Sequence, residues 1–132
     1  MGTRVDASFG FDSWDEEDVG TADGTSIHRV VFVKRFEGGI TGRSTGWMTM
    51  AQHESGSGAY GGSERYEVTV DGRSGTFVAQ HHAGGSVASG FGSSVEVLEG
   101  SATGDLDGLT GSLEITRHDD GSHTVTLDYD LP

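Results

Sequence analysis

The chain has 132 residues, of which 23 are glycine, one is proline and none is cysteine. Its formal net charge at pH 7 is −13, from 21 acidic and 8 basic side chains. This length suits one domain, residues 1–132, with a core of its own, and the missing thiols exclude disulfides, thiol catalysis and thiolate metal ligands. A surface this acidic repels DNA and anionic membranes, so we expect neither nucleic acid nor a membrane as a partner.

No segment predicts export or membrane insertion. Residues 1–11 lack the apolar stretch of a signal peptide. No apolar run approaches the ~20 residues that a membrane-spanning helix needs. We therefore expect a cytoplasmic protein that is a monomer or a small homo-oligomer.

Apolar side chains recur with a period of two, which predicts strands rather than helices. A first strand over 5–11 leads to Trp14, and the acidic stretch 15–24 is expected to be a turn and loop too charged to pack. A second strand follows over 27–36. The face of this strand that we predict to be buried carries Val30, Phe32, Lys34 and Phe36.

Turn signals divide the rest of the chain into six more strands. Gly38 and Gly39 predict a hairpin turn before the strand 40–52, and Asp71-Gly72 predicts a type I′ hairpin. The remaining strands are expected at 60–70, 75–82, 86–98, 111–116 and 122–131. Eight strands in meander order predict an all-β protein, an eight-stranded antiparallel closed barrel, with a two-sheet sandwich as the alternative.

One motif matches a catalytic pattern by letter only. Ser44 stands in a Gly-x-Ser-x-Gly pattern, but that motif needs a strand-to-helix turn and the residues after it predict a strand. His81 and His82 are neighbours on a strand and point to opposite faces, so they cannot bind one metal ion together. We expect no metal and no other cofactor.

The most informative side chain is Glu64, which shares the predicted buried face of the strand 60–70 with Tyr66. A buried carboxylate is costly unless it is paired, and Lys34 and His81 are the candidate partners. Such a group is either a structural ion pair or the polar part of a ligand cavity. The candidate ligand-binding residues are therefore Glu64, His81, Lys34 and Tyr66, and no catalytic residue is identified.

Five segments together resemble a bacterial family, the domain of unknown function 3224, over nearly the whole chain. They are SWDE at 13–16, GSERY at 62–66, GRSGTFVAQH at 72–81, GSATGDL at 100–106 and TLDYDL at 126–131. The resemblance implies a barrel like that of allene oxide cyclase, with a cavity, but no established reaction. No cyclase motif is transferred to a residue of this chain.

Three functions are consistent with these observations. The first is a binding protein whose barrel takes a small, mainly apolar molecule. The second is an isomerase or cyclase in the same cavity, with Glu64 as acid or base and His81 or Lys34 setting its protonation. The third is a structural or interaction protein with a filled barrel. Whether the protein is an enzyme is left open.

Overall fold

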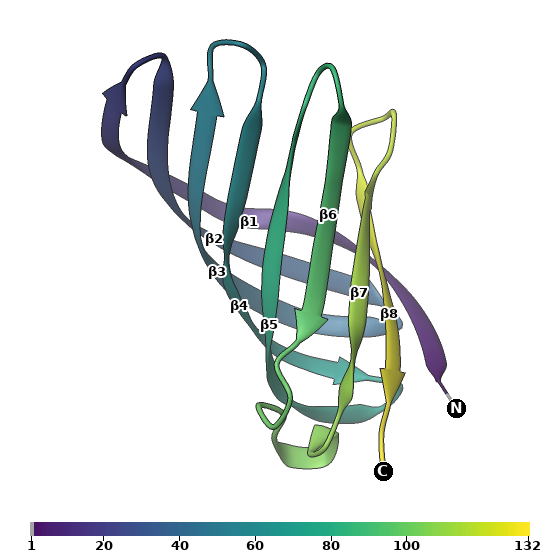
Figure 1. Ribbon diagram of the computed structural model, residues 1–132. Helices are drawn as coiled ribbons and strands as arrows, with labels where there is room; N and C mark the ends of the chain where they lie inside the picture. Colours follow the sequence, from purple (N-terminus) through teal and green to yellow (C-terminus); the bar gives the residue numbers. More distant parts are fainter. Residues whose placement is uncertain (1) are drawn as a thin grey trace.

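Residues 2–132, which the computed structural model describes, form eight antiparallel strands that close into a barrel in sequence order (Figure 1). The elements are β1 (Thr3–Ala22), β2 (Thr25–Gly38), β3 (Ile40–His53), β4 (Gly58–Val70), β5 (Arg73–Ser86), β6 (Gly90–Val97), the single-turn 3₁₀ helix η1 (Gly104–Leu106), β7 (Thr110–Arg117) and β8 (His123–Asp130). β8 pairs with β1 and closes the sheet. The closed barrel confirms the predicted fold class, and the sandwich alternative is wrong.

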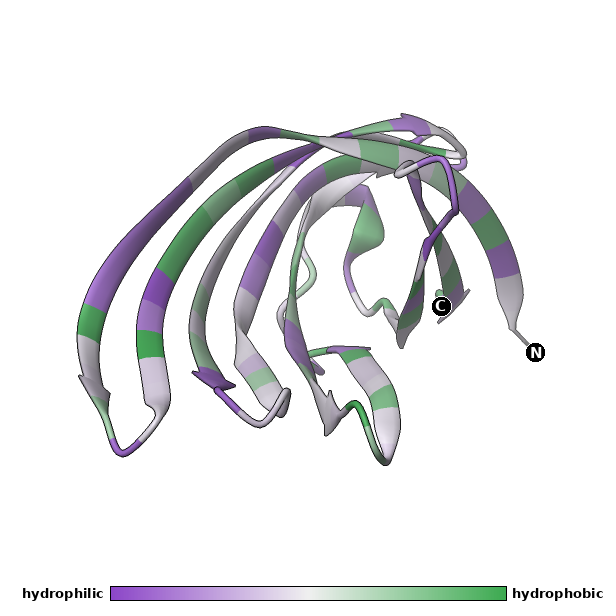
Figure 2. Cartoon of the chain, turned by 90° about the horizontal axis from the view of Figure 1, so that it is seen from above, coloured by the Kyte–Doolittle hydropathy of each residue, from purple (hydrophilic) through white to green (hydrophobic). Residues whose placement is uncertain are grey.

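Period-two alternation positions the side chains as the sequence predicts. Along the strands, hydrophilic and hydrophobic residues follow one another in bands (Figure 2). The predicted inward face of β2 is buried, including Lys34. The β4–β5 hairpin turns at Asp71 and Gly72, whose φ angles of 49° and 81° are both positive, as a type I′ turn requires.

The acidic stretch 15–24 is mostly strand and not the predicted loop. β1 continues to Ala22 in pairing with β2, and its acidic side chains are exposed on what is here the edge strand of the sheet. The prediction was wrong because a strand whose backbone is paired needs no packed face, and water solvates its charges. Glu17 also forms an ion pair with Arg29 across the pair, with 3.2 Å between Oε2 and Nη1.

One end of the barrel is filled and sealed. Tyr66 and Phe77 stack with ring centroids 4.6 Å apart, and both are fully buried. The loop around η1 covers this end (Figure 1), and Leu106 and Leu109 are fully buried there. This end supplies the main hydrophobic core, which holds the closed part of the barrel together.

The opposite end is closed less completely. β1 pairs with β8 only from Thr3 to Phe9, and β6 pairs with β7 only at Val95 and Glu96. Across the described part of the chain, residues 10–22 and 90–94 therefore each have a ladder partner on one side only. The long hairpins rise above this opening, and the candidate site lies at its base.

Candidate functional site

A buried polar cluster centres on Glu64, whose side chain is 0% exposed. Lys34 Nζ lies 3.2 Å from Oε2 and 3.4 Å from Oε1 of this carboxylate. Ser44 donates its hydroxyl to Oε2 at 2.6 Å. His81 Nδ1 lies 3.4 Å from Oε1, which is a looser contact outside good hydrogen-bond geometry. Lys34 and Ser44 are thus the firmer partners of the carboxylate.

Strand register brings Lys34, Ser44 and Glu64 together with Tyr66 from three strands. Lys34 on β2 lies opposite Ser44 on β3, and Ser44 lies opposite Tyr66 on β4. Glu64 points to the same face two residues before Tyr66. Because paired residues in a sheet project to the same face, all of them meet inside the barrel.

The charges of the cluster follow from its burial and its contacts. Burial raises the pKa of Glu64, but His81, the Lys34 ammonium and the Ser44 hydroxyl together lower this pKa to about 2. The carboxylate is therefore ionised at neutral pH. Burial lowers the pKa of Lys34, and the Glu64 charge opposes that change. Burial beside Glu64 raises the pKa of Tyr66 well above its usual value, so Tyr66 stays neutral.

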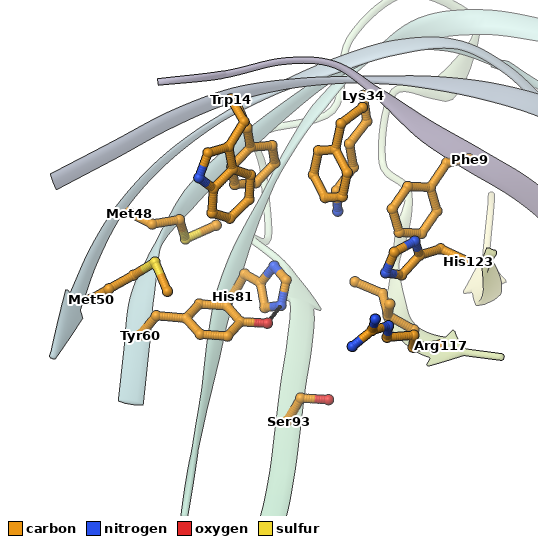
Figure 3. A pocket seen from close by; sticks show the side chains of 13 residues that line it. Phe9, Trp14, Lys34, Met48, Met50, Tyr60, His81, Ser93, Arg117 and His123 are labelled. Atoms are coloured by element: carbon orange, nitrogen blue, oxygen red, sulfur yellow. Dashed lines mark hydrogen bonds between the residues drawn. The ribbon is translucent and has the colours of Figure 1, made fainter. Parts of the chain in front are cut away.

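A cavity of about 360 Å³ adjoins this cluster at Lys34 and His81, and Figure 3 shows the side chains that line it. Every strand contributes to its wall, so the cavity exists only when the barrel is closed. The apolar lining side chains are Phe9, Phe11, Trp14, Phe32, Met48, Met50 and Ile115, and the polar ones are Lys34, Tyr60, His81, Ser93, Arg117 and His123. The wall is mainly aromatic and thioether, with the polar groups spaced around it.

Phenylalanine rings surround the one lysine of the chain. Lys34 Nζ lies 4.4 Å from the ring centroid of Phe9, 5.1 Å from that of Phe32 and 6.0 Å from that of Phe11. A cation over aromatic faces is stabilised by the ring quadrupole, most strongly where water is excluded. These rings stabilise the ammonium in addition to its ion pair with Glu64.

His81 connects the buried carboxylate with the cavity. Its Nδ1 faces Glu64, while its Nε2 lies 3.3 Å from the hydroxyl of Tyr60. Tyr60 lines the cavity, and Figure 3 shows its hydroxyl pointing inward beside the imidazole. Burial raises the pKa of Tyr60, with a smaller contribution from Glu64. A neutral Tyr60 hydroxyl is thus offered to whatever occupies the cavity.

Gly46 makes room for the aromatic wall. It lies opposite Phe32 in the sheet, and a Cβ at this position would be 2.1 Å from Phe32 Cζ. We expect Gly46→Ala to push the ring into the cavity and lower the free energy of unfolding by about 1–3 kcal/mol, measured by denaturant titration. Gly10→Ala is the control, because no atom lies within 4 Å of its Cβ. Equal effects of the two substitutions would contradict this account of Gly46.

Comparison with known proteins gives a family match over the barrel. The family model described as "Protein of unknown function (DUF3224)" matches residues 5–129. The chain belongs to the DUF3224 family. A crystal structure of a DUF3224 protein of unknown function from Shewanella oneidensis MR-1, at 1.84 Å resolution, is similar with a TM-score of 0.86 and 27% identity. The similarity covers 100% of this chain and 99% of that one. No curated protein matches the sequence.

The four predicted ligand-binding residues of this DUF3224 protein separate into two layers. Lys34 and His81 line the cavity, whereas Glu64 and Tyr66 lie beneath it and do not. The predicted inward orientation of Glu64 is confirmed, and both of its candidate partners contact it. Ser44, which the sequence shows only as a false nucleophile motif, is the third partner.

Trp14 is a cavity residue that alternation alone does not reveal in this DUF3224 chain. Phe11 and Trp14 are three positions apart, so strict alternation would place them on opposite faces. A register shift between Phe11 and Ser13 adds one residue, and both rings then face the cavity. The aromatic residues on either side of Asp12 are the only sequence signal of this bulge.

The described residues contain no group of three or more histidine, aspartate or glutamate side chains arranged to hold a metal ion. Within the same range, no helix is long and apolar enough to cross a membrane.

Proposed function

We propose that this DUF3224 protein binds a small, mainly apolar molecule in the cavity at the open end of its barrel. The observation that carries this proposal is the aromatic lining of a space of about 360 Å³, to which all eight strands of the described chain contribute. Ligand pockets are typically concave, largely apolar and supplied with a few fixed polar groups. Here the aromatic wall would contact the body of the ligand, and Tyr60, His81 and Arg117 would contact its polar atoms.

The rigid floor under the cavity supports the same proposal. Lys34 is held by Glu64 and by phenylalanine rings, so its orientation is fixed before any ligand binds. A site that is organised in advance loses less conformational entropy on binding. The filled, sealed end of the barrel supplies the stability that an open, partly hollow end needs.

Tryptophan fluorescence tests the proposal, because one of the two tryptophans lines the cavity. Trp14 is in the lining, whereas Trp47 is exposed on the outer face, so a Trp47→Phe protein reports from Trp14 alone. We expect the neutral probe 4-phenylbutanamide to change this fluorescence in a saturable way, with a Kd below about 1 mM.

Phe11→Ala, which removes part of the wall, is expected to weaken binding of 4-phenylbutanamide about tenfold. Val19→Ala removes an exposed apolar side chain from the same strand outside the cavity and should leave the Kd unchanged. If no phenyl compound binds with a Kd below about 1 mM, the proposed function is wrong.

An isomerase or cyclase in this cavity is the weaker candidate. Glu64, its predicted acid or base, lies beneath the cavity and has a pKa of about 2, which leaves it ionised and shielded at neutral pH. Acid–base chemistry here would depend instead on His81 and Tyr60, whose Nε2 and hydroxyl meet at 3.3 Å. The likeness to allene oxide cyclases that the sequence implies stays a prediction.

A further inference from the structure

The cavity has the opposite charge to the protein that contains it. The chain carries a net charge of −13, yet none of the residues that line the cavity is acidic. Two of the eight Lys and Arg side chains, Lys34 and Arg117, lie in the lining, together with two histidines. An anion that approaches the protein is repelled by most of its surface and attracted at this opening.

In this wall, the positive charge of Arg117 is the one that no carboxylate of the described chain compensates. Four other arginines, Arg4, Arg29, Arg35 and Arg65, each form an ion pair with a carboxylate. Within residues 2–132 no ion pair joins Arg117 to a carboxylate. Figure 3 shows its guanidinium directed from β7 toward the cavity, beside His123.

The other cation in the wall is already neutralised. Lys34 forms its ion pair with Glu64, so the pair contributes no net charge to the cavity. His123 stacks on Phe9 with 5.1 Å between the ring centroids. Burial and the positive charges of Arg117 and Lys34 lower the pKa of His123, so its ring is neutral at pH 7. Arg117 therefore carries the positive charge in the wall that no carboxylate of the described residues neutralises.

We propose that the ligand is an apolar monocarboxylate, whose aromatic or alicyclic body packs against the aromatic wall and whose carboxylate binds the Arg117 guanidinium. This inference rests on the proposed function, since it names the chemical class of the molecule in the same cavity. The planar guanidinium donates two parallel hydrogen bonds to a carboxylate. A single unpaired guanidinium matches the one charge of a monoanion better than the two charges of a phosphate dianion. No glycine is among the lining residues, and η1 lies at the far end of the barrel, so no backbone cradle for a phosphate is present in the described chain.

Three probes with one body and different head groups test the inference by Trp14 fluorescence in the Trp47→Phe protein. They are 4-phenylbutanoate, 4-phenylbutanamide and 4-phenylbutan-1-amine. We expect the carboxylate to bind about tenfold more tightly than the amide and the amine to bind most weakly. The preference for the carboxylate should diminish as salt is added, because the guanidinium is exposed to solvent.

Arg117→Gln is expected to weaken binding of 4-phenylbutanoate about tenfold and to leave binding of the amide unchanged. Arg43→Gln is the matched control, since Arg43 is exposed on β3, forms no ion pair within the described residues and lies outside the cavity lining. It should change neither affinity.

The possible results separate this inference from the proposed function. Equal binding of the carboxylate and the amide would overturn the monocarboxylate inference and leave the apolar cavity in place. Tighter binding of 4-phenylbutyl phosphate than of 4-phenylbutanoate would overturn it in favour of a dianion. A carboxylate preference that survives Arg117→Gln would overturn the assignment of Arg117. Failure of all the phenyl probes would overturn the proposed function itself.

Discussion

Glu64→Gln is expected to lower the free energy of unfolding at pH 7 by about 3–5 kcal/mol. The carboxylate and the Lys34 ammonium lie 3.2 Å apart and are 0% and 3% exposed. Glutamine keeps the shape of the side chain but removes the charge, which leaves the ammonium buried without an anion. Denaturant titration measures the loss, and Glu67→Gln is the control because its ion pair with Arg65 is half exposed.

This loss should depend on pH in a defined direction. The pKa of Glu64 is about 2 in the folded protein and 4.5 is the ordinary value, so its contribution is fully present above about pH 4.5. As the pH falls from about 4.5 toward 2, the carboxylate of the unfolded chain takes up protons first and the contribution is lost. A carboxyl with these two pKa values contributes about 3 kcal/mol. The stabilities of the original protein and the Gln variant should therefore converge in acid.

A double substitution separates charge pairing from packing. Lys34→Met with Glu64→Leu replaces the ion pair with apolar side chains of similar volume, which is often neutral or stabilising. We expect the double variant to recover most of the stability that Glu64→Gln loses. A Gln variant as stable as the original protein at every pH would show that the ion pair contributes nothing to folding.

Phe77→Ala is expected to destabilise the protein by about 3–5 kcal/mol, the usual cost of a large cavity in a packed core. Phe77 is 0% exposed and stacks on Tyr66 in the filled end of the barrel. Phe11→Ala, in the wall of the open end, should cost less than about 1 kcal/mol, because its ring is 42% exposed.

The effects of these two substitutions on ligand affinity should be the reverse of their effects on stability. The folded fraction of the Phe77→Ala protein should bind 4-phenylbutanamide as the original does, since Phe77 is outside the lining, whereas Phe11→Ala weakens binding. Thermal unfolding and fluorescence titration on the same two variants check both halves of this expectation. Similar stability losses for the two would contradict the division into a filled end and a hollow end.

Alternation alone predicted much of the floor of the site. It placed Lys34 on the inner face of β2 and Glu64 on the inner face of β4, because a shift by one residue would turn whole apolar faces to water. It left His81 and Lys34 as competing partners, and both contact the carboxylate. Local side-chain patterns determine orientation well when one face of a strand is buried.

The wall of the cavity depends on features that alternation does not encode. The bulge near Asp12 reverses the facing of Trp14, and only the three-residue spacing of Phe11 and Trp14 distinguishes it from a regular strand. Arg117 lies at the end of a short strand, so its approach to the cavity follows from hairpin length and barrel closure. The partnership of Ser44 with Glu64 depends on the register between β3 and β4, which is a long-range property.

The incomplete pairing of β1 also affects how copies of the protein meet. Residues 10–22 present backbone donors and acceptors along one side, and an unpaired strand edge is a template for aggregation. This segment contains Asp12, Asp15, Glu16, Glu17 and Asp18. Two molecules that approach edge to edge therefore bring like charges together, and the repulsion opposes the growth of a continuous sheet between them. The acidic run thus protects the colloidal stability of a barrel whose edge is left open.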